Sequence, residues 1–262
     1  MVMHKRGQIT VFVILGILII AVLGLIFYLY NLRTVPEVEK ISEFDFSKTE
    51  VLKNYVEGCI EKAGNEALNL IGKQGGEINP GFYLSYYGNK LGYLCYTTEY
   101  ASCYNKKPFL LNYVQNEIDA YVTRKITSCI NELDNVVKNK GYTMQKGNLD
   151  IKTSINPYSA SININYPITI KSSTGAQVQQ SSFVKTFNMP LGRLIKSAED
   201  IINQEIKNPQ GVVFYNAYTL SQNGEISIER DTYANTEIYI INAQNNPYKF
   251  QFAVQNYVTP FP

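Results

Sequence analysis

The chain has 262 residues, enough for one large or two small domains around a hydrophobic core. Its 24 basic and 22 acidic residues nearly cancel, which argues against a nucleic-acid partner, because such partners need clustered positive charge. The only histidine is His4, so the composition also argues against a Ser-His-Asp triad or a histidine-ligated zinc in the rest of the chain.

The first predicted element is a transmembrane helix over residues 9–30, which contain no charged side chain. At 1.5 Å per residue this helix would be roughly 33 Å long, enough for a hydrocarbon core of about 30 Å. The apolar run is longer than the core of a secretory signal peptide, about 7 to 15 residues, so we expect no ordinary signal cleavage. A buried helix of a soluble core is the alternative, but such helices rarely carry so long an apolar run.

Charge around this element predicts its orientation. Lys5 and Arg6 lie in the short tail 1–8, whereas acidic residues offset the basic ones in the segment 31–46. The positive-inside rule then places the N-terminus in the cytoplasm and the rest outside, as a single-pass protein of the cell membrane. Segment 31–46 contains Pro36 and mixed charges, and is typical of a spacer.

Beyond the spacer, residues 47–262 are predicted to form an extracytoplasmic α+β head, whose helical part is 47–141. Ser47 and Glu50 have the spacing of a capping box, and an apolar stripe follows for about 25 residues until Gly72, Gly75 and Gly76. Residues 77–107 have no clear period. A second long apolar stripe begins near Pro108 and ends at Gly141, which predicts a second long helix.

The remaining part, 147–262, changes to a period of two. Apolar residues alternate over 149–155 and 162–170, with Pro167 indicating an edge strand or a bulge. One helix is expected within 189–206, and four further strands follow. Asn223-Gly224 is a strong signal for a type I′ hairpin turn. The predicted fold is therefore a transmembrane helix, two long helices and a mostly antiparallel sheet with one inserted helix.

Four cysteines, Cys59, Cys95, Cys103 and Cys129, predict two disulfides in an oxidising compartment. None has the C-x-x-C spacing of a zinc site, so metal binding is the weaker alternative. Of the three possible connectivities we favour Cys95 with Cys103, which closes a short loop. Cys59 and Cys129 then pair, because both lie on apolar stripes of helices that can pack together.

Candidates for catalysis are few. A carboxylate pair for glycoside hydrolysis could be drawn from Asp150, Glu225, Glu229 and Asp231, but acidic residues that alternate on strands are usually solvated. We therefore expect no enzyme, no cofactor and no metal.

The N-terminal stretch KRGQITVF resembles the class III signal peptides of archaeal type IV pilins and archaellins. The resemblance implies that Lys5, Arg6 and Gly7 are recognised by a prepilin peptidase and that Gln8 becomes the new N-terminus. Position 12 is phenylalanine, where pilins typically carry glutamate. The whole chain is also similar to uncharacterised single-span surface proteins of small-genome archaea.

The sequence thus favours a membrane-anchored cell-surface protein with a structural, adhesive or protein-interaction role. Its expected partners are membrane lipid and either another protein or a second copy, bound through the head or the apolar helix. A pilin-like filament or pseudopilin subunit is the first alternative, and a ligand-binding ectodomain is the second. A concave pocket with several convergent polar groups would favour the ligand-binding alternative.

Overall fold

The structure is a computed structural model of the whole chain that describes residues 14–16, 18–24, 48–208, 218–219, 221–233 and 235–256. It divides into two compact units, Met1–Glu43 and Phe44–Pro262. In the first unit, residues 14–16 and 18–24 are helical, and their large apolar side chains are exposed.

The predicted transmembrane helix is contradicted. In the described part of the chain, no helix combines the length and the apolar character that crossing a bilayer requires. This corrects the span assigned to 9–30, and with it the single-pass membrane topology with a cytoplasmic N-terminus and an extracytoplasmic head.

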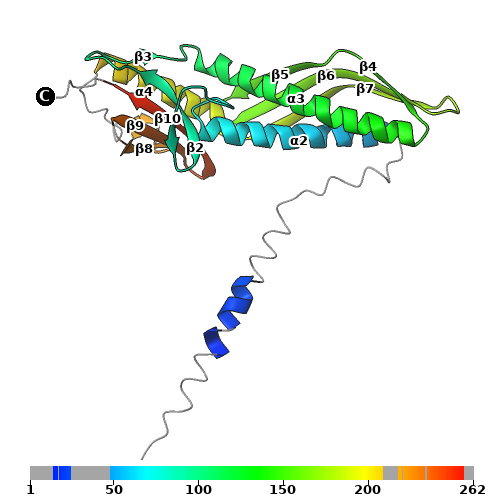
Figure 1. Cartoon of the computed structure of the whole chain (residues 1–262), viewed down its shortest axis with the longest axis horizontal. Coiled ribbons are helices and arrows are strands. Elements are labelled where there is room, and N and C mark those ends of the chain that lie inside the picture. Colours follow the sequence, from blue (N-terminus) through cyan, green and yellow to red (C-terminus); the bar gives the residue numbers. More distant parts are fainter. Residues whose placement is uncertain are drawn as a thin grey trace, which may run out of the picture. The chain divides into compact units, whose positions relative to one another are not determined.

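Two long helices lie side by side in the second unit, α2 (Thr49–Lys73) and α3 (Leu110–Asn139) (Figure 1). Their apolar stripes are buried against each other and against both sheets, as the period of 3.6 predicts. Lys48 occupies the N-cap position of α2, and Ser47 lies outside the described residues. Gly72 lies inside α2, one residue before the helix ends at Lys73. Glycine is needed there because a Cβ would meet the Lys249 carbonyl oxygen at 2.5 Å.

The first sheet combines strands from both ends of the second unit. Its strands are β1 (Tyr83–Tyr86), β2 (Asn89–Tyr96), β3 (Tyr104–Asn105), β8 (Ile226–Tyr233), β9 (Thr236–Ala243) and β10 (Asn246–Gln255). The order is β1-β2-β10-β9-β8, with β3 on β2. β2 and β10 are parallel and the other pairs are antiparallel, so the sheet is mixed.

This first sheet is strongly curled. In a flat sheet, four strand spacings of about 4.8 Å would hold β1 and β8 roughly 19 Å apart. However, the Tyr86 hydroxyl of β1 donates a hydrogen bond to Asp231 of β8 at 2.7 Å. Tyr86 also packs on a buried cluster formed by Leu91, Tyr93, Ile238 and Ala253. The cluster therefore fills the concave side of the curl.

The second sheet has β6 (Ser159–Lys171) at its centre. β4 (Thr143–Lys146) and β5 (Asp150–Asn156) pair with one side of β6, and β7 (Gln177–Asn188) pairs with the other, all antiparallel. The register shifts between Asn165 and Ile168, so Pro167 lies at a bulge. Helices α2 and α3 pack on this sheet, and α4 (Leu191–Lys207) contacts both sheets.

The predicted fold class is wrong in two respects. The described residues contain no membrane-spanning helix at the N-terminus, and they form two sheets, one of them mixed, in place of one mostly antiparallel sheet. The first three strands precede α3, in the range 77–107 that showed no period. The physical reason is that β2 is buried on both faces over five consecutive residues, so it carries no alternation.

Both disulfides join the cysteines that the sequence pairs. Cys59 of α2 is bonded to Cys129 of α3, across the seam between the two helices. Cys95 of β2 is bonded to Cys103, just before β3. The first disulfide ties two elements that are 70 residues apart, and the second closes a local loop.

Candidate functional site

The residues singled out from the sequence do not assemble into one site. The expected processing residues, Lys5, Arg6, Gly7 and Gln8, lie outside the described residues. Asp150 begins β5 of the second sheet, whereas the other three carboxylates lie at the start of β8 or on it, in the first sheet. Each of those three has its own partner: Glu225 pairs with Arg193, Glu229 accepts from Asn242 and Asp231 accepts from Tyr86.

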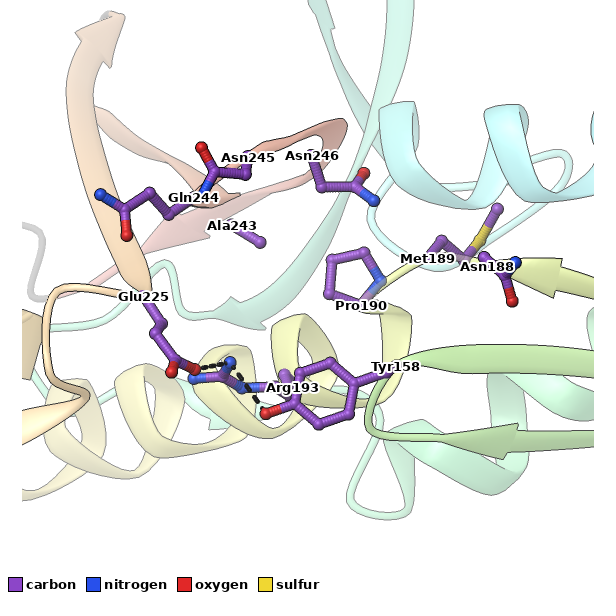
Figure 2. A pocket seen from close by; sticks show the side chains of 10 residues that line it. All are labelled: Tyr158, Asn188, Met189, Pro190, Arg193, Glu225, Ala243, Gln244, Asn245 and Asn246. Carbon is purple, nitrogen blue, oxygen red and sulfur yellow. Dashed lines mark hydrogen bonds and ion pairs between the residues drawn. The ribbon is translucent and has the colours of Figure 1, made fainter.

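A cleft of about 410 Å³ opens where the two sheets meet the start of α4 (Figure 2). Five separate parts of the chain surround it. They are the β5–β6 turn with Tyr158, the β7–α4 junction with Asn188, Met189 and Pro190, the first turn of α4 with Arg193, the residue Glu225 before β8, and the β9–β10 turn Ala243–Asn246. The volume is within the range of small-molecule sites.

Arg193 organises one wall of the cleft. Its guanidinium forms an ion pair with the Glu225 carboxylate, lies 5.3 Å from the centre of the Tyr158 ring and donates to the Tyr158 hydroxyl at 3.4 Å. Figure 2 shows the three side chains meeting on this wall. Gly192 permits the arrangement, because a Cβ there would meet the Asn156 carbonyl oxygen at 2.5 Å. The start of α4 can therefore approach the β5–β6 turn closely.

Side-chain amides form the rest of the polar lining. Asn188 lies at the end of β7, and Gln244, Asn245 and Asn246 come from the β9–β10 turn. Asn245 has a φ of 60°, which asparagine tolerates better than most residues and which the tight turn needs. Among the described residues, the side chains of Asn188, Gln244 and Asn245 have no hydrogen-bond partner, so their donors and acceptors remain open to a ligand or water.

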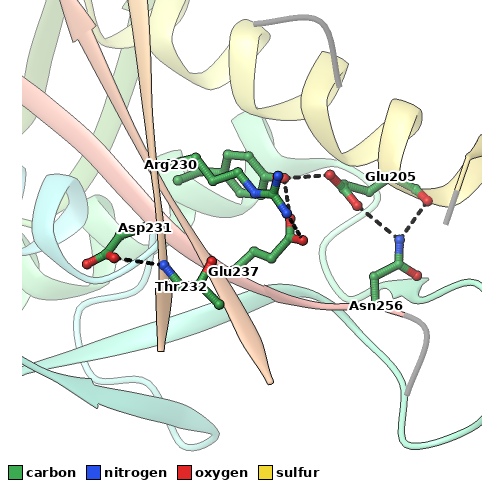
Figure 3. A network of polar contacts seen from close by, with 7 residues as sticks. Glu205, Arg230, Asp231, Thr232, Glu237 and Asn256 are labelled. Carbon is green, nitrogen blue, oxygen red and sulfur yellow. Dashed lines mark hydrogen bonds and ion pairs between the residues drawn. The ribbon is translucent and has the colours of Figure 1, made fainter. Parts of the chain in front are cut away.

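A second polar cluster lies at the other end of α4, and Figure 3 shows it around Glu205. Glu205 is only 4% exposed. Its Oε2 accepts from Asn256 at 3.0 Å, and its Oε1 lies 2.5 Å from the Tyr239 hydroxyl oxygen. The same hydroxyl oxygen lies 2.6 Å from Glu237, which forms an ion pair with Arg230.

The Tyr239 hydroxyl lies between two carboxylates. A tyrosine hydroxyl has one proton and can donate it to only one of two carboxylates. Glu237 is the better acceptor for that proton, because Arg230 balances its charge. The Glu205 carboxyl then shares the Tyr239 hydroxyl with a second carboxylate, which favours its protonated form. Burial raises the pKa of Glu205 above its ordinary value, and the nearby charge of Glu237 adds to this, against hydrogen bonds from Tyr239 and Asn256 that lower it.

Sequence reasoning missed both clusters. The cleft residues come from five separate segments, and no segment contains a sequence motif that predicts a binding site. Glu205 had a weaker signal, since it follows Ala198 and Ile202 at helical spacing on the buried face of α4. A carboxylate on an apolar stripe indicates a paired or protonated group.

In the described part of the chain, no group of three or more histidine, cysteine or acidic side chains is placed to hold a metal ion. Comparison with protein-family models, with curated proteins and with solved structures finds no match.

Proposed function

We propose that this chain is a non-catalytic binding protein with an adhesive or ligand-capturing role, and that the cleft beside Arg193 is its binding site. The observation that carries the proposal is a cleft of about 410 Å³ that several polar side chains line. Clefts of this size with a few placed polar groups are the usual form of a ligand site.

A binding role fits the chemistry of the cleft better than catalysis. Its two charged groups, Arg193 and Glu225, are paired with each other, so neither is poised as a general acid or base. All four cysteines are in disulfides, which leaves no thiol nucleophile. The amides and the Tyr158 ring can recognise a ligand without changing it.

Filling the cleft should abolish binding. We expect Gln244→Tyr to remove the hits that the full-length wild-type protein gives in saturation-transfer NMR with a library of neutral, anionic and cationic fragments. The matched control is Val184→Tyr, which places the same ring on an exposed position of β7 outside the cleft. Absence of hits, or hits that Gln244→Tyr retains, would contradict the proposed site.

A pilin-like subunit is the second candidate. Residues 14–16 and 18–24 support it, because they are helical and expose large apolar side chains that a bundle of identical helices would cover. We expect the intact mass of the native protein, measured without reductant, to correspond to a chain that starts at Gln8. A mass that includes Met1 or Val2 would argue against prepilin-type processing.

A further inference from the structure

We propose that the ligand of the cleft is a neutral carbohydrate, which stacks on the Tyr158 ring and is held by the surrounding side-chain amides. This inference rests on the proposed function and assigns the ligand class of that same site. Four properties of the cleft support it: its charge balance, its amide groups without a partner, its exposed ring and the absence of an open strand edge at the β9–β10 turn.

Charge argues for a neutral ligand. Arg193 and Glu225 are the only charged residues of the lining, and they form an ion pair. An anionic ligand would have to displace Glu225 from Arg193, and a cationic ligand would have to displace Arg193 from Glu225. Either exchange gives up a charge-assisted hydrogen bond, so the pair penalises both signs of charge.

The amides match hydroxyl groups. Each carboxamide of Asn188, Gln244 and Asn245 offers two N–H donors and an acceptor oxygen, and each sugar hydroxyl offers one donor and two acceptor sites. These three side chains have no partner among the described residues, so their hydrogen bonds to water can be exchanged for bonds to a ligand at little cost. At one end of the cleft, the Arg193 guanidinium adds N–H donors and the Glu225 carboxylate adds two acceptor oxygens.

Tyr158 supplies an apolar platform. The residue is 64% exposed, and the Arg193 guanidinium lies over its ring and donates to its hydroxyl. These contacts hold the ring in place, while most of its surface remains accessible. One face of a pyranose ring carries mainly C–H groups, and such a face packs well on an aromatic ring whose polar tip is already bonded.

An extended peptide fits the amide wall less well. Recognition of a peptide strand relies on an open sheet edge that supplies main-chain hydrogen bonds. The β9–β10 turn offers no such edge, because Ala243 pairs with Ile226 on one side and with Asn246 on the other. At this turn a ligand is therefore recognised through side chains.

The test is binding of the full-length protein to an immobilised panel of neutral oligosaccharides, uronate-containing and sialylated oligosaccharides, and extended Gly/Ser/Asn peptides. We expect binding to neutral members, weakened about tenfold or more by Tyr158→Ala and less than about threefold by Tyr158→Phe, which keeps the ring. The matched control is Tyr104→Ala, because Tyr104 is 65% exposed on β3, outside the cleft, and its loss should leave binding unchanged.

The outcomes separate this inference from the proposed function. Preference for acidic saccharides or peptides would overturn the ligand class and leave the binding site in place. Fragment hits in the cleft without any saccharide binding would do the same. Equal loss of affinity in Tyr158→Phe and Tyr158→Ala would overturn the stacking role. Absence of both fragment and saccharide binding would overturn the inference and the proposed function together. Thermal melts of each variant verify that it is folded.

Discussion

Replacing both Cys59 and Cys129 by alanine is expected to lower the free energy of unfolding by about 4 kcal/mol, the largest effect among the predictions made here. The disulfide closes a loop of sequence separation 70, and the loss of chain entropy in the unfolded state grows with that length. Urea denaturation of the oxidised protein measures the change. The slope of the unfolding free energy against urea should increase, because the unlinked unfolded chain exposes more surface.

The Cys95–Cys103 disulfide provides the comparison. Its sequence separation is 8, so loop entropy predicts a cost of about 2.5 kcal/mol for the corresponding double alanine variant. Both of its cysteines are buried, and their removal adds a small packing loss. The urea slope should change much less than for the long loop. If the two variants change that slope equally, the long-loop disulfide does not constrain the unfolded state as argued.

The helices of the second unit could be predicted because they are amphipathic. Leu52, Val56 and Ala63 of α2 recur at helical spacing and are buried, and the stripe of α3 is equally regular. The same stripes carry Cys59 and Cys129, so the pairing of these cysteines followed from the packing of two faces. Apolar residues at helical spacing are a local pattern, so they can be recognised in the sequence without knowledge of the fold.

The sheets could be predicted only in part. Strands β5 and β6 alternate as the sequence predicts, but the parallel pairing of β2 with β10 joins residues about 160 positions apart. Nothing local to either strand specifies its distant partner. The curl of the first sheet, which brings Tyr86 to Asp231, is likewise a property of the assembled sheet.

The N-terminal membrane span was predicted from the sequence, but the structure does not support it. Residues 9–30 have the composition of a membrane helix, and composition alone suggested its length. In the part of the chain that the structure describes, however, no helix is both long enough and apolar enough to cross a bilayer. A lack of charge in the sequence therefore does not by itself establish a membrane span.

The candidate sites were the least predictable features. Tyr158, Arg193 and Gln244 belong to a turn, a helix and a hairpin, and only the fold brings them to one cleft. Their residue types are common on surfaces and carry no motif. Glu205 is the exception, because a carboxylate on the buried face of α4 conflicts with the apolar pattern around it.

Glu205→Gln is expected to remove a pH dependence of stability. The pKa of Glu205 is raised in the folded protein above the ordinary value of 4.5, so its contribution to stability is fully present below that value and is lost as pH rises through the folded-state pKa. Glutamine is neutral at every pH and can both donate to Tyr239 and accept from Asn256. The difference in unfolding free energy, wild type minus variant, should therefore fall as pH rises from about 4 to 8.

Two further variants complete this test. Glu205→Ala leaves Asn256 and Tyr239 without their buried partner and opens a cavity, so it should cost about 3 kcal/mol near pH 4. Because alanine also lacks the titrating carboxyl, this cost should fall with rising pH in parallel with the Glu205→Gln difference. Glu229→Gln changes an exposed carboxyl on β8 that accepts from Asn242, and it should run parallel to wild type. Asp119 and Glu199 also have raised pKa values, but they are present in every variant and cancel in the difference.

The pH dependence of the stability difference also tests whether Glu205 carries a proton in the folded protein. If Glu205 holds it, the chain runs from Glu205 through the Tyr239 hydroxyl to Glu237, and the negative charge rests beside Arg230. Deprotonation then places two carboxylates against one hydroxyl in a buried site, which loosens the contact between the end of α4 and β9. A difference between wild type and Glu205→Gln that stays constant from pH 4 to 8 would contradict the raised pKa of Glu205.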